Sequence, residues 1–101
     1  MFGTVAKCTV KPGKDEEMLA LASEWTKANS SAGQIAGYTF KLEKQPGEYM
    51  SIAIFPSRDE YYRFAQRSET DEWYRKWREL LEADPEWNDG EVIQSDVFAR
   101  I

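Results

Sequence analysis

Histidine is absent from this sequence of 101 residues, and cysteine occurs only once, as Cys8. A single thiol cannot form an internal disulfide or a cysteine-based metal site. Without histidine the thiol also lacks an imidazole base, so we expect Cys8 to be a small buried residue rather than a nucleophile. The acidic residues fall on predicted helix surfaces and loops, and we therefore predict no metal site.

Positive charge is also scarce, because 13 lysine and arginine residues stand against 18 aspartate and glutamate residues, giving a net charge of -5. Binding to nucleic acid or to an anionic membrane surface requires a basic surface, so we expect neither partner. No run approaches the roughly 18 apolar residues of a membrane span, and residues 1–10 lack the pattern of a secretion signal. We therefore expect a cytoplasmic protein.

Hydrophobic residues make up 42% of the chain and aromatic residues 14%, which is enough for a folded core. The length suits one domain, residues 1–101. Residue patterns predict strands at 2–11, 35–43, 49–55 and 91–101. In the third strand Met50, Ile52 and Ile54 face one way while the alternate residues, also largely apolar, face the other, so we expect both faces to be covered.

Helices are predicted between the strands. Apolar residues at three- and four-residue spacing predict a helix that is capped by Asp15 and ends near Asn29. Ser57 followed by Glu60 is a capping box and predicts a second helix start. That helix should break near residues 68–70, and a further helix should run over 71–83.

This order predicts an α+β fold with the ferredoxin-like βαββαβ layout, in which helices cover one face of a four-stranded antiparallel sheet. The uncovered face would hold many apolar residues, among them Ala53 and Phe55 or their alternates, Val97 and Ile101. Such a face would be a large exposed apolar patch in water. We therefore expect a homodimer formed through the open sheet face, which would complete a dimeric α+β barrel.

The sequence VKPGK at residues 10–14, which closes the first strand before an acidic amphipathic helix, resembles the start of antibiotic biosynthesis monooxygenase domains. The strand at residues 37–38, the following hairpin, the passage through residues 54–64 and the last helix with Trp73 continue the resemblance over roughly residues 2–99. The resemblance implies a dimeric α+β barrel with a small-molecule cleft between sheet and helices. It also implies candidate activities, which include cofactor-free oxygenation of polycyclic phenols, quinol oxidation and haem degradation.

The chain departs from that family at four places. Phe55 ends the third strand, where tryptophan is usual, and Phe64 stands where a histidine is common. Haem-degrading members carry an asparagine and a histidine at the positions that match Ala6 and Trp77. Haem degradation with histidine ligation is therefore not expected, and no cofactor is predicted.

Cofactor-free oxygenation needs an apolar pocket, a proton acceptor and donors for a developing oxyanion. Asn29 and Asp96 are the candidate catalytic residues, because Asn29 follows the apolar stripe of the first helix and Asp96 interrupts an apolar strand. Asn29 has the alternative role of a helix C-terminal cap, which the pattern favours. Asp96 has the alternatives of a dimer-interface hydrogen bond or a solvent edge.

The candidate substrate-binding residues are aromatic, and they are Trp25, Tyr38, Tyr62, Trp73 and Trp77. Aromatic residues at helical spacing are also typical of an ordinary core, so this alternative stays open. The function hypothesis is a cofactor-independent monooxygenase or related oxidoreductase that acts on an aromatic or quinone-like molecule. The alternative is a non-catalytic dimeric barrel that binds a small apolar molecule or serves only as a structural module.

Overall fold

We describe a computed structural model of the chain, which defines residues 1–30 and 32–99. Its elements follow the order βαββααβ. They are β1 (Phe2–Thr9), α1 (Asp15–Ala28), β2 (Ala36–Lys41), β3 (Glu48–Phe55), α2 (Arg58–Ala65), α3 (Ser68–Glu79) and β4 (Asp89–Glu91). The α+β class is confirmed, and two helices do follow β3, but the break between them lies at residues 66–67 and not at the predicted 68–70, which belong to α3.

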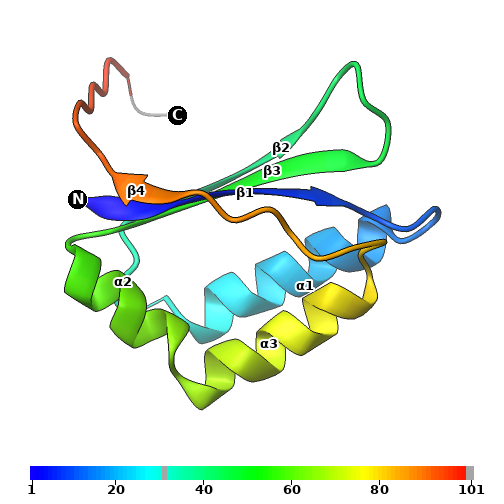
Figure 1. Cartoon of the computed structure of the whole chain (residues 1–101), viewed down its shortest axis with the longest axis horizontal. Helices are drawn as coiled ribbons and strands as arrows, with labels where there is room; N and C mark the ends of the chain where they lie inside the picture. The colour runs from blue at the N-terminus through cyan, green and yellow to red at the C-terminus, as the bar shows by residue number, and fades with distance from the viewer. Residues whose placement is uncertain (31, 100–101) are drawn as a thin grey trace.

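The four strands form one antiparallel sheet in the order β2-β3-β1-β4, which is the ferredoxin-like arrangement. All three helices lie on one side of this sheet, with α1 and α3 side by side and α2 beneath the opposite end (Figure 1). No helix within the described residues is long and apolar enough to cross a membrane.

The pairing of β1 with β3 determines which side chains face the helices. Its register runs from Phe2 opposite Phe55 to Thr9 opposite Glu48. Because side chains alternate along a strand, the even-numbered residues of β1 and the odd-numbered residues of β3 share the helix-facing side. The predicted alternation in β3 is therefore confirmed, but Ala53 and Phe55 face the helices and their alternates form the open face.

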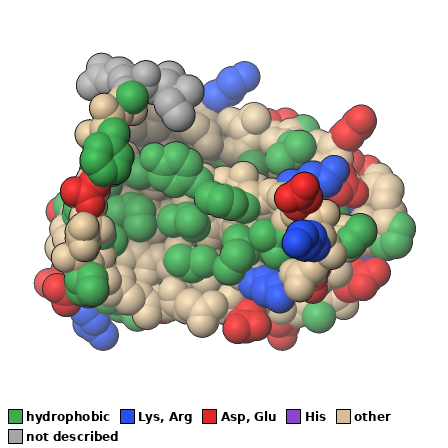
Figure 2. All heavy atoms as spheres, turned by 90° about the horizontal axis from the view of Figure 1, so that it is seen from above, with side chains coloured by type: hydrophobic (Ala, Val, Ile, Leu, Met, Phe, Trp, Pro, Cys, Tyr) green, Lys and Arg blue, Asp and Glu red, His purple; other side chains and the backbone are tan. Residues whose placement is uncertain are grey.

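That open face is apolar near its centre and its β2 edge. Tyr38 pairs with Ile52 and Phe40 with Met50, and both aromatic side chains are more than half exposed, at 62% and 53%. Hydrophobic side chains gather across the face opposite the helices (Figure 2). The expectation that both faces of β3 are covered is thus met only on the helix side within this single chain.

The last strand is much shorter than predicted. Pairing with β1 covers three residues, from Thr4 opposite Asp89 to Phe2 opposite Glu91, and Val92 then donates its N–H to the carbonyl of Met1. Residues 93–99 therefore run beyond the sheet, and Figure 1 shows this segment on the side opposite the helices. The predicted strand over 91–101 is wrong in this respect, and the predicted position of Ile101 lies outside the described residues.

The helix ends also differ from the sequence prediction, for local reasons. Asp15 does not cap α1, since its carboxylate accepts a hydrogen bond from the Tyr49 hydroxyl. Ser57 does cap α2, with its Oγ accepting from the N–H of Glu60. The last helix ends at Glu79 rather than Ala83, because the backbone of the next residues bonds to the end of the first strand; the carbonyl of Leu80 accepts from the N–H of Lys11.

The filled part of the core lies under the second half of β1. It is built from side chains of the sheet, α1, α3 and the segment after α3, namely Ala6, Cys8, Val10, Met18, Tyr49, Trp77 and Leu81. Cys8 is 5% exposed, which confirms that it is a small buried residue. Burial raises the pKa of its thiol to about 11, so the thiol is protonated at neutral pH.

Leu81 is completely buried, and its truncation tests this packing. We expect Leu81→Ala to lower the free energy of unfolding by about 2–5 kcal/mol, because it removes buried methyl groups and leaves a cavity. Urea denaturation followed by tryptophan fluorescence measures the change. Leu19→Ala is the control, since Leu19 is 49% exposed on α1 and should change stability little. Equal effects of the two substitutions would contradict the described core.

Candidate functional site

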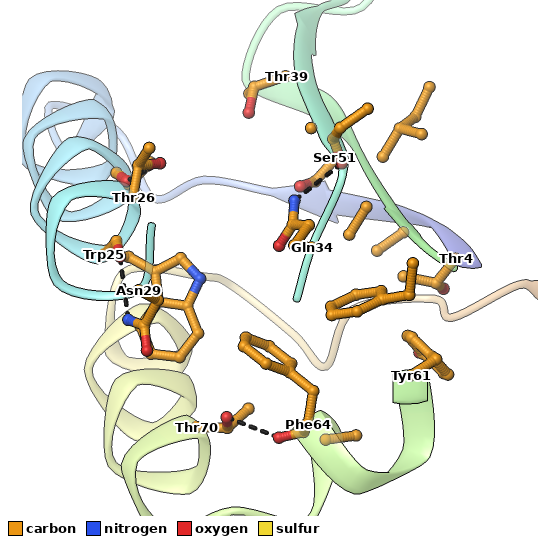
Figure 3. A pocket seen from close by; sticks show the side chains of 18 of the residues that line it. Thr4, Trp25, Thr26, Asn29, Gln34, Thr39, Ser51, Tyr61, Phe64 and Thr70 are labelled. Carbon is orange, nitrogen blue, oxygen red and sulfur yellow. Dashed lines mark hydrogen bonds between the residues drawn. The ribbon is translucent and has the colours of Figure 1, made fainter. Parts of the chain in front are cut away.

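A cavity of about 490 Å³ lies between the helix-facing side of the sheet and the three helices. This volume is within the range of small-molecule sites. Figure 3 shows residues from the sheet, α1, the loop after α1, α2 and α3 around it. The cavity predicted between sheet and helices is therefore present in the chain.

The cavity exists because the strand residues beneath it are small. Thr4 and Ala6 of β1 and Ser51 and Ala53 of β3 line it, and the register places Thr4 beside Ala53 and Ala6 beside Ser51. Sheets and helices pack at separations near 10 Å, which small side chains cannot span. Space therefore remains between Phe2 opposite Phe55 at one end of the ladder and the filled core at Cys8 and Tyr49.

Aromatic side chains from the helices form the facing wall. Trp25 packs edge-on against Phe64 at 5.4 Å between ring centroids and lies 4.9 Å from Trp73, which stacks on Trp77 at 5.3 Å. All four residues line the cavity. The predicted positions of Trp25, Trp73 and Trp77 at a pocket wall are thus found in the structure, and Trp77 belongs to the filled core as well.

Two buried polar atoms in the cavity walls have no hydrogen-bond partner within the described residues. They are the hydroxyl Oγ1 of Thr4 and the indole Nε1 of Trp73. Leaving such a group unpaired in a protein interior costs about 1–3 kcal/mol. Both atoms have almost no accessible surface, so they lie behind the cavity surface, and Thr4 Oγ1 lies beside the Tyr61 hydroxyl.

Asn29 is the C-terminal cap of α1, the alternative that the sequence pattern favoured, and it also lies at the cavity. Its backbone N–H and its side-chain Nδ2 both donate to the carbonyl of Trp25. Its Oδ1 accepts a hydrogen bond of 2.7 Å from Nη2 of Arg67, a residue that sequence analysis did not single out. Figure 3 shows Asn29 beside the Trp25 ring.

Tyr61 takes the place that the sequence analysis assigned to Tyr62. Tyr61 is 8% exposed, lines the cavity with Phe64 and donates its hydroxyl proton to Oδ1 of Asp89 at 2.9 Å. Burial, together with that bond, raises the pKa of Tyr61 well above its ordinary value, so it stays protonated. Tyr62 lies one residue around the helix, outside the cavity lining, and donates to Oδ2 of Asp89.

Two further predicted residues lie elsewhere than expected. Tyr38 borders the cavity, but the strand register places its side chain on the open face opposite Ile52. Asp96 is exposed beyond β4 and outside the cavity lining, where its Oδ2 accepts a hydrogen bond from Gln94, so within this chain it has the solvent-exposed position considered as an alternative and not that of a buried base. Of the predicted site residues, Asn29 and the three tryptophans come together around the cavity.

The lining contains no aspartate, glutamate, lysine or arginine among the residues that the structure describes. In the same part of the chain, no cluster of three or more potential ligands could hold a metal ion. The cavity can therefore enclose a flat apolar molecule and offer it hydrogen-bond donors, but its own lining offers no carboxylate to accept a proton.

Several solved structures share the fold of this chain. One is an antibiotic biosynthesis monooxygenase, 17% identical, with a TM-score of 0.77 over 93% of this chain and 100% of the other. A putative antibiotic biosynthesis monooxygenase from Bordetella bronchiseptica is 17% identical, with a TM-score of 0.80 over 92% and 97%. A variant of SnoaB, a cofactor-independent oxygenase from Streptomyces nogalater, is 15% identical, with a TM-score of 0.80 over 93% and 94%.

No family model and no curated protein sequence matches the chain. The resemblance stated from sequence is confirmed as a shared fold with antibiotic biosynthesis monooxygenase structures. The four positions at which the sequence departs from that family, Ala6, Phe55, Phe64 and Trp77, all line the cavity. Residues of this chain that differ from those implied by the resemblance therefore shape the candidate site itself.

Proposed function

We propose that this protein is a cofactor-independent monooxygenase or related oxidoreductase that acts on a flat aromatic or quinone-like molecule in the cavity. The observation that carries the proposal is the cavity of about 490 Å³ with its largely aromatic wall. A ring system fits against Trp25 and Trp73, and its oxygen atoms can accept from amide or hydroxyl groups of the lining such as Asn29 and Ser51. The shared fold with a cofactor-independent oxygenase is a supporting analogy.

In the proposed reaction a ring carbon of the substrate loses a proton, and the resulting anion passes one electron to O₂. Recombination forms a carbon–oxygen bond. The peroxide then takes up a proton, and its O–O bond breaks as the second C–H proton leaves, so that a carbonyl group and water are the products. The cavity contributes by enclosing the ring and stabilising the anion with hydrogen bonds. Because its described lining holds no carboxylate, the first proton passes to solvent.

A blocked cavity tests this proposal. Ala22 lines the cavity from α1, whereas Ala20 is exposed on the same helix. With anthrones and hydroquinones as substrates, we expect oxygen uptake above buffer for the wild type and, from an anthrone, a product in which one oxygen replaces two hydrogens. Ala22→Phe should reduce the rate about tenfold or more by displacing the ring, while Ala20→Phe should not. Oxygen electrode traces and product mass spectra measure both effects.

The outcomes separate the two function hypotheses. Binding of these molecules without oxygen uptake, lost in Ala22→Phe, would support the non-catalytic small-molecule-binding barrel. Absence of both binding and turnover would contradict every ligand-based function for this cavity and leave a structural role.

We further propose that two copies of the chain associate through their open sheet faces. The face formed by β2, β3 and β1 carries half-exposed Tyr38 and Phe40. The segment 93–99 adds three more side chains with very high exposure: Ile93 at 92%, Val97 at 84% and Phe98 at 96%. The segment lies on the same side of the sheet as this face (Figure 1), so the two can cover each other in a two-fold pair.

Sedimentation at micromolar concentration tests the association. We expect the wild type to have twice the chain mass of 11.7 kDa. Phe40→Asp should sediment as a monomer, because it places a charge in the apolar interface. Leu19→Asp changes a similarly exposed residue on α1, away from the open face, and should remain dimeric. A wild type of 11.7 kDa would contradict the proposal.

A further inference from the structure

Arg67 lies between α2 and α3, directly behind one wall of the cavity. Its Nη2 donates to Asn29 at 2.7 Å, its Nε donates to Thr70 Oγ1 at 3.5 Å, and its guanidinium lies 4.5 Å above the ring centroid of Phe64. All three partners line the cavity. The side chain is therefore held by residues that would themselves contact a ligand.

The charge of Arg67 is not neutralised by an ion pair in the described part of the chain, where no carboxylate oxygen lies within 4.0 Å of its nitrogens. Glu69, two residues along, is fully exposed and accepts a hydrogen bond from Ser68. The pKa of Glu69 is lowered first by its bond from Ser68 and also by attraction to Arg67, but no charged residue is found in the described lining, and Arg67 is the cation bonded directly to it.

The hydrogen bonds also fix the orientation of the Asn29 amide. Oδ1 must accept from the guanidinium, and Nδ2 must donate to the carbonyl of Trp25 at 2.9 Å. The reverse orientation would set two donors against each other at Arg67 and two acceptors at Trp25. The second N–H of Nδ2 has no acceptor among the described residues, so it is available to a ligand as a donor polarised by Arg67.

We propose that Arg67 is a positioning residue that makes the Asn29 end of the cavity an oxyanion site, so that the ligand binds as an aromatic oxyanion, a phenolate or enolate. This inference rests on the proposed function, because it concerns the ionisation state of the same ligand. It also explains how an anion forms in a cavity whose described lining has no carboxylate: Arg67 and Asn29 lower the free energy of the ionised form, and solvent takes the proton.

A matched pair of probes tests the inference. The first is 2-hydroxy-1,4-naphthoquinone, which is ionised at neutral pH, and the second is its methyl ether, which has the same rings and no charge. Quenching of tryptophan fluorescence measures both affinities, since Trp25 and Trp73 line the cavity. We expect the wild type to bind the anion about tenfold more tightly than the ether, as for a charge-assisted hydrogen bond.

Three variants assign that preference to Arg67. Arg67→Gln should bind both probes with nearly equal affinity, with the ether unchanged. Arg67→Lys keeps the charge and should retain part of the preference, which a purely structural role would not explain. Arg63→Gln removes the same charge from an exposed position on α2 and should retain all of it. Urea denaturation establishes that each variant is folded.

Equal binding of the two probes by the wild type, or an unchanged preference in Arg67→Gln, would overturn the inference and leave the proposed aromatic site intact. Failure of the wild type to bind either probe would instead count against the proposed function. The two failures are therefore distinguishable in one experiment.

Discussion

The antiparallel register between β1 and β3 is the constraint on which the rest of the structure depends. It sets eight residue pairs, and among those facing the helices the two small pairs, Thr4 with Ala53 and Ala6 with Ser51, lie between Phe2 opposite Phe55 and Cys8 opposite Tyr49. Thr4, Ala6 and Ala53 leave room below the sheet, whereas Cys8 and Tyr49 join the filled core. A shift of one residue would exchange the two faces and remove both features. The cavity is therefore a direct result of strand pairing and side-chain size.

The polar character of the cavity follows from the helices that close it. Their aromatic residues fill most of the wall, and charged groups stay out of the described lining. The two ends of the wall nevertheless differ in polarity. At one end Asn29 accepts a hydrogen bond from the Arg67 cation, whereas near Thr4 the Tyr61 hydroxyl donates to Asp89. An apolar cavity with donors at its walls suits a flat ring system that carries oxygen atoms, and it favours a ligand whose charge is negative.

Sequence patterns predicted the element order and the faces of β3 because alternation and helical spacing report burial directly. They failed for residues 93–99, whose apolar side chains have the pattern of a buried strand although the pairing with β1 covers only Asp89–Glu91. Periodicity found the tryptophans of the cavity but could not choose Tyr61 over Tyr62, since that depends on the exact rotation of α2. Arg67 was missed because a charged residue at a helix junction is ordinarily solvated, and only tertiary contacts reveal its role.

The central claim is that the space between sheet and helices is a ligand site rather than an incidental void. The chain has four tryptophans, all of which line this cavity, so their indole N–H signals report on it in a nitrogen-15-labelled sample. We predict that adding 2-hydroxy-1,4-naphthoquinone shifts the indole signals of Trp25 and Trp73 in a saturable manner, because both rings line the cavity. Unchanged positions for all four signals at saturating probe concentration would contradict the account.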